Sequence, residues 1–182
     1  MHPRDIEEKV HEICDAEGIF KEIMKPNDKF RFAFKVAYPP WHPHPKNLIV
    51  TMPKGKKFIS IELATKISPP HLEAFKKIED TSKIQFQQVF FHLMRNMLLN
   101  RNLLYTFSMK NNSYVITEHI YEDGLTLDNF YRQMRKVYFA SISAQIMLND
   151  VVSGKFKGMV LPSSKIGTSE EGQGSPEDLY YS

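Results

Sequence analysis

A segment of alternating aromatic and branched residues places the strongest constraint on the fold of this chain. Phe30, Phe32, Phe34, Val36 and Tyr38 alternate with shorter or charged residues. A period of two residues is that of a β-strand, and one apolar face beside a partly polar face is typical of an antiparallel sheet. The segment therefore predicts a sheet with one buried face and one face that is at least partly wet.

Further strand segments lie on both sides of this one and are separated by turn sequences. The predicted strands are 19–24, 47–52, 58–64, 103–109 and 113–121. Pro, Gly, Asn and Asp between them supply the backbone angles that tight turns need. We expect five to six antiparallel strands in total.

Four segments show helical periodicity. The first covers residues 3–17 and is followed by Gly18, a residue suited to ending a helix. The second opens at Ser68-Pro69, and the third follows a capping box over 82–85. The last begins after the cap Thr126. The expected fold is α+β, an antiparallel sheet packed against helices in the order helix, three or four strands, two helices, two strands, helix.

The last helix carries one regular apolar stripe that should lie on the sheet. Its residues recur at spacings of four and three: Phe130, Met134, Val137, Ser141, Ala144, Leu148 and Val151. The second half of the helix has more apolar surface than this stripe uses.

A second apolar face follows Phe139, Ile142 and Ile146, roughly 100–120° around the helix from the main stripe. Small residues at 140, 141, 143 and 144 would let another element approach the backbone closely. The first helix or the C-terminal tail could cover this face within one chain. Alternatively it is a homodimer or partner surface, because contiguous exposed apolar patches mark interfaces.

The connection over 39–45 holds two further candidate features. Trp41, the single tryptophan, sits among prolines and is either a rigid contact residue or an aromatic that folds back over its own sheet. His42 and His44 flank Pro43 and could point the same way, but a metal site needs a third ligand. They are weak metal candidates, and a solvated loop that changes its charge near neutral pH is the alternative.

Length and composition predict one domain and a tail. Of 182 residues, we assign 1–151 to a single α+β domain and 152–182, rich in Ser, Gly and Pro, to a flexible C-terminal tail. The lone cysteine, Cys14, lies on the apolar face of the first helix and is expected to be a buried small hydrophobe. No secretion signal and no apolar run of about 20 residues is present, which favours a cytoplasmic protein without a membrane partner.

The sequence contains no short catalytic motif, no phosphate-binding loop and no cofactor signature. An enzyme without such a motif remains the third hypothesis. Net charge is only +3, with basic residues spread over predicted turns and helix faces, so nucleic acid is an unlikely partner. A nucleic-acid-associated regulator is the second hypothesis.

The element order, with its long apolar middle helix and the strand pair before the last helix, resembles the type III secretion chaperone-like fold that is shared with YbjN-type regulators. It is similar to a small uncharacterised prokaryotic family placed with that fold. The resemblance covers residues 3–150 and implies a helix-backed sheet, frequently homodimeric, that binds proteins. The first hypothesis is therefore a non-enzymatic, chaperone- or adaptor-like module that binds itself and another protein and needs no cofactor.

Overall fold

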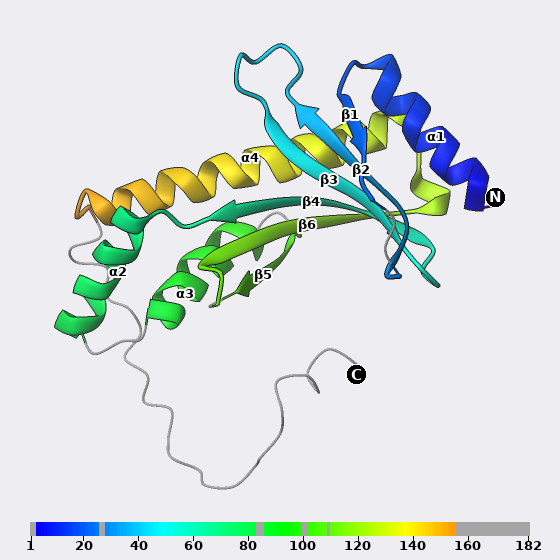
Figure 1. Ribbon diagram of the computed structural model, residues 1–182. Helices are drawn as coiled ribbons and strands as arrows, with labels where there is room; N and C mark the ends of the chain where they lie inside the picture. Colours follow the sequence, from blue (N-terminus) through cyan, green and yellow to red (C-terminus); the bar gives the residue numbers. More distant parts are fainter. Residues whose placement is uncertain (1–2, 26–27, 83–85, 100–101, 109, 156–182) are drawn as a thin grey trace, which may run out of the picture.

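The computed structural model describes residues 3–25, 28–82, 86–99, 102–108 and 110–155 (Figure 1). The elements are α1 (Pro3–Ala16), β1 (Phe20–Ile23), β2 (Phe30–Tyr38), β3 (Lys46–Pro53), β4 (Phe58–Lys66), α2 (Pro69–Ser82), α3 (Phe86–Leu99), β5 (Leu104–Ser108), β6 (Ser113–Tyr121), the short 3-10 helix η1 (Glu122–Gly124) and α4 (Leu127–Val152). The prediction of an α+β chain with an antiparallel sheet packed against helices is confirmed.

The strands form one antiparallel sheet in the order β1-β2-β3-β4-β6-β5. Val50 of β3 pairs with Phe34 of β2 and with Ile61 of β4, so these side chains share one face. The alternation that predicted β2 places its larger side chains on this face, where Phe34 and Val36 are buried.

All four described helices contact this face or each other. His11 of α1 lies 5.5 Å from Phe34, measured between ring centroids, and Phe90 of α3 lies 5.6 Å from Tyr114 of β6. Helix α4 crosses behind the central strands, and α2 packs against α3 and α4 (Figure 1). The opposite face of the sheet carries no helix among the described residues.

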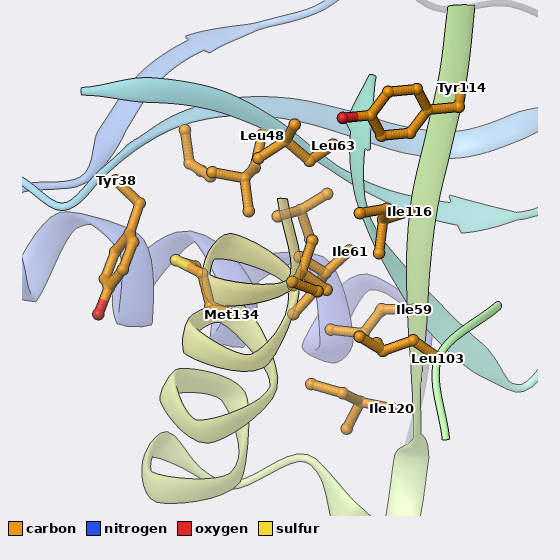
Figure 2. Packing of buried hydrophobic residues seen from close by; sticks show 14 of the residues in the cluster. Tyr38, Leu48, Ile59, Ile61, Leu63, Leu103, Tyr114, Ile116, Ile120 and Met134 are labelled. Atoms are coloured by element: carbon orange, nitrogen blue, oxygen red, sulfur yellow. The ribbon is translucent and has the colours of Figure 1, made fainter. Parts of the chain in front are cut away.

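Helix α4 builds the centre of the core. All seven residues of its predicted stripe are buried, which confirms that assignment. Met134 belongs to the same buried cluster as Ile61 of β4 and Ile116 of β6 (Figure 2). The helix begins as predicted, because the Thr126 side chain accepts a hydrogen bond from the Asn129 amide at 3.2 Å.

The predicted ends of the first helix and the predicted start of the third lie at or near gaps in the described residues or at element boundaries. Helix α1 ends two residues before Gly18, which has a φ of +64°, as expected for a glycine that terminates a helix. The capping box at 82–85 and the tail after Lys155 lie largely outside the described residues.

Candidate interaction surface

The predicted interface residues lie on the surface and face solvent. We call Trp41, Phe139, Ile142 and Ile146 the α4 patch. Trp41 is 78% exposed, Phe139 56% and Ile146 57%, while Ile142 is partly buried. An apolar side chain that stays more than half exposed gains little hydrophobic free energy from folding. Burial of the α4 patch against another surface would therefore be stabilising.

The fold joins Trp41 to α4 through two tyrosines. The Trp41 ring lies 6.1 Å from Tyr38, and Tyr38 lies 5.4 Å from Tyr138 of α4, both as edge contacts. Tyr138 in turn lies 5.4 Å from Phe139. Trp41 therefore packs on Tyr38 of its own sheet while most of the residue stays exposed, and its role as a contact residue stays a prediction.

A polar contact fixes the same loop to the helix. At the start of β3, the Lys46 ammonium donates to Ser141 Oγ at 3.1 Å and to Gln145 Oε1 at 3.0 Å. Burial lowers the pKa of Lys46. These bonds bring the end of the loop over 39–45 beside the middle of α4.

Three of the four small residues of α4 are buried against the chain's own sheet and do not belong to the exposed face. Ala140, Ser141 and Ala144 are fully buried on the helix side that faces the sheet. Only Ser143 is partly exposed, and its hydroxyl donates to the Phe139 carbonyl at 3.0 Å. The main stripe uses these small residues for close packing of α4 on its own sheet.

Helix α1 does not cover the α4 patch. Its apolar side, including Val10 and Cys14, is buried in the core, and His11 of α1 packs on Phe34 of β2. Among the described residues, nothing removes Phe139 or Ile146 from solvent. The tail beyond Lys155 lies outside that description, so cover by the tail stays an alternative.

The outer surface of α4 changes character along its length. Its first half carries Asp128, Arg132 and Arg135, all exposed, with Arg132 4.0 Å from Asp128. Its second half carries Phe139, Ile142 and Ile146. Apart from Leu127 and Val152 at its two ends, the exposed large apolar side chains of α4 are thus Phe139 and Ile146.

The candidate metal ligands His42 and His44 are both exposed, with ring centroids 6.4 Å apart. The His44 amide donates to His42 Nδ1 at 3.0 Å, which occupies one of the two possible ligand atoms of His42. Within the described ranges, no group of three or more His, Cys, Asp or Glu side chains is placed to hold a metal ion.

Two other features of the structure are a buried thiol and a surface hollow. Cys14 is buried, and desolvation, with a smaller contribution from Asp15, raises the pKa of its thiol to about 12. This thiol is a structural group at neutral pH. A hollow of about 450 Å³ lies between α1 and β1. Its lining residues are Glu7, Glu8, His11, Glu12, Ile23 and Phe34.

The fold and the α4 patch define a helix-backed antiparallel sheet of the α+β class that exposes an apolar surface. The family model described as "Uncharacterized conserved protein (DUF2299)" matches residues 6–148. The chain belongs to this family.

A solved structure shares the fold. The crystal structure of an uncharacterized protein from Methanothermobacter thermautotrophicus superposes with a TM-score of 0.66 and 24% sequence identity, over 79% of this chain and 96% of that chain. A search of curated proteins finds no match. Among the described helices, none combines the length and hydrophobicity that a bilayer span requires.

Proposed function

We propose that this chain is a non-enzymatic, homodimeric protein-binding module in which the α4 patch forms the dimer contact. The observation that carries the proposal is the exposure of Trp41, Phe139 and Ile146, with Trp41 connected to Phe139 through ring contacts of Tyr38 and Tyr138. Rigid aromatic anchors beside aliphatic side chains are typical of the energetic centre of an interface.

The exposed area of the α4 patch is comparable to that of the largest apolar patches on monomeric proteins, which are often functional. With about 200 Å² for one aromatic side chain, Trp41 and Phe139 alone expose on the order of 270 Å². Ile146 adds to this, which brings the patch into the range of the largest patches on monomers, roughly 300–600 Å². A stable dimer buries about 800 Å² per partner, so the Trp41 loop and the flanks of α4 would contribute as well.

The spacing along α4 suits a two-fold axis. Phe139 and Ile146 are seven residues apart, about 10.5 Å along the helix, with Ile142 near the midpoint. If two copies of α4 cross antiparallel at Ile142, Phe139 of one subunit meets Ile146 of the partner subunit, and the reverse contact follows by symmetry. A self-complementary stripe of this kind favours a second copy of the chain as the occupant.

The resemblance to the type III secretion chaperone-like fold also supports the proposal, because that resemblance implies homodimers that bind proteins. The similar solved structure contributes the fold alone. The chaperone- or adaptor-like role would then use other surfaces of the dimer for the second partner.

The test is the mass of the full chain in solution, measured by light scattering after size exclusion at high micromolar concentration. We expect a dimer for the wild type and a folded monomer for the double variant Ile142→Glu/Ile146→Glu, because each introduced carboxylate would be buried unpaired at the contact.

The double variant Leu127→Glu/Val152→Glu is the matched control. It also replaces two exposed apolar residues of α4 with glutamate, at the two ends of the helix outside the patch. This control should remain a dimer. A monomeric wild type would rule out the dimer, and a dimeric Ile142→Glu/Ile146→Glu variant would place the interface elsewhere.

A further inference from the structure

The face of the sheet that carries no described helix has its own pattern. Ala33, Thr51, Ser60 and His119 are neighbours in the strand register across β2, β3, β4 and β6. The first three are short side chains and are less than a tenth exposed. The centre of this face is therefore lined by short side chains, and larger side chains flank it on both sides.

Three rings form a row at one side of this centre. Phe58 of β4 pairs with Tyr121 of β6, and their ring centroids are 5.8 Å apart. His119 stacks on Phe58 at 4.2 Å with an interplanar angle of 29°. Tyr121 is 60% exposed, and burial lowers the pKa of His119, so its ring is neutral at pH 7. Tyr121 therefore offers an exposed ring to a planar ligand, next to the stacked pair of Phe58 and His119.

The turns beside this row are basic. The Lys54 amide donates to the Lys29 carbonyl at 2.9 Å, which places the β3–β4 turn against the β1–β2 turn, and both lie at the lower right of Figure 1. The Glu122 amide donates to the Lys57 carbonyl at 3.2 Å, which places the end of β6 beside the β3–β4 turn.

This end of the sheet gathers more cations than acids. The cations are Lys25, Lys29, Arg31, Lys54, Lys56 and Lys57, and the acids are Asp28, Glu122 and Asp123. In the described part of the chain, Lys54, Lys56 and Lys57 are exposed and none of the three forms an ion pair. Along the sequence these basic residues are dispersed over separate turns, and the pairing of the strands brings the turns together.

We propose that this face binds single-stranded RNA. Bases would stack on the row of Tyr121, Phe58 and His119, and the phosphates would lie along Lys54, Lys56 and Lys57. Open sheet faces with aromatic side chains stack bases, and neighbouring cations track the backbone. The combination of rings and cations distinguishes this surface from the α4 patch, which has rings but no charge.

Two polar neighbours favour RNA over DNA. Glu62 and Thr117 pair across β4 and β6, on the side of the row away from the basic turns. Burial raises the pKa of Glu62. A carboxylate here repels phosphate, which directs the backbone toward the turns, and it can accept a hydrogen bond from a ribose 2′-hydroxyl, which DNA lacks.

The test measures fluorescence anisotropy of a labelled oligo(U) of about 12 nucleotides with the full chain at about 50 mM salt. The triple variant Lys54→Glu/Lys56→Glu/Lys57→Glu should weaken binding at least tenfold. Its plot of log affinity against log salt should be less steep by about 2, since each phosphate contact contributes about 0.7 for single strands. Tyr121→Ala should weaken binding about tenfold through lost stacking.

The matched control is Lys66→Glu/Lys76→Glu/Lys110→Glu, which changes the net charge equally at exposed positions away from the basic turns. This control should lower the affinity for oligo(U) by less than threefold. The Ile142→Glu/Ile146→Glu variant should bind oligo(U) like the wild type, which separates this site from the proposed dimer contact. Oligo(dT) of equal length should bind several-fold more weakly. The proposal would be overturned if oligo(U) did not bind, if the two triple variants lost equal affinity, or if Tyr121→Ala bound like the wild type. Binding of oligo(dT) or of duplex RNA as tight as that of oligo(U) would overturn it as well.

Discussion

The α4 patch and the helix-free face of the sheet differ in the chemistry that they expose. The α4 patch combines Trp41 with Phe139 and Ile146 and contains no charged residue. The helix-free face combines Tyr121 with the cations of the β3–β4 turn. An apolar surface binds another apolar surface, whereas a basic surface with aromatic rings binds a nucleic acid. One scaffold can therefore serve two kinds of partner.

The two surfaces are also separated by the core. Helix α4 lies on one face of the sheet, and the row of Phe58 and Tyr121 lies on the other. A contact at one surface therefore leaves the other accessible.

Trp41→Ala should give the largest effect, and it should act on the α4 patch alone. Loss of a tryptophan that anchors an interface costs about 2 kcal/mol or more, a weakening of dimerisation of at least about 30-fold. Sedimentation equilibrium would measure this change. Trp41→Phe, which keeps an aromatic ring in contact with Tyr38, should retain most of the affinity, and oligo(U) binding should be unchanged in both variants. An equal loss of oligo(U) affinity would mean that the two surfaces are coupled.

Lys136→Met should weaken the scaffold between the surfaces without changing either one. Lys136 of α4 forms an ion pair with Glu118 of β6, and both side chains are largely buried. Removal of the cation leaves the Glu118 carboxylate unpaired, which should lower the free energy of unfolding by about 1–3 kcal/mol.

Urea denaturation would measure the effect of Lys136→Met. The double variant Glu118→Gln/Lys136→Met should recover part of the loss, because no unpaired charge remains. If the losses of stability measured for Lys136→Met and for Glu118→Gln alone simply add in the double variant, the pair does not join α4 to β6 energetically.

His119 should make a smaller, pH-dependent contribution from the helix-free face. Burial lowers the pKa of His119 below its ordinary value of 6.5, although Glu118 opposes the shift. The unfolded chain then binds this proton more readily, so the stabilisation is complete above pH 6.5 and is lost as the pH falls through the pKa of the folded state.

The measurement is the free energy of unfolding of the wild type and of His119→Phe between about pH 5 and 8. The wild type should lose more stability toward low pH than the variant. Glu62, whose pKa is raised by burial, acts in the opposite sense in both proteins and cancels in their difference. Identical pH dependence in the two proteins would show that His119 is as solvated in the native as in the unfolded state.

The interface candidates could be found in the sequence only where the signal was local. Phe139, Ile142 and Ile146 follow from helical periodicity, and Trp41 was chosen for its residue type and stiff loop. The tyrosines that connect them were missed, because Tyr38 and Tyr138 are 100 residues apart and no local pattern links them. The row of Phe58, His119 and Tyr121 was missed for the same reason: alternation placed each ring on a strand, but the pairing of β4 with β6 was unknown.

By itself, the sequence determined the period of each element and the side that each element buries. The alternation over β2 and the seven-residue stripe of α4 are local consequences of backbone geometry, and both are present in the folded chain. Only the tertiary structure decided that the helices share one face, that the Trp41 loop lies beside α4, and that two basic turns meet at one end of the sheet. These arrangements depend on strand register and on packing between segments distant in the chain, where the stabilising contacts are non-local.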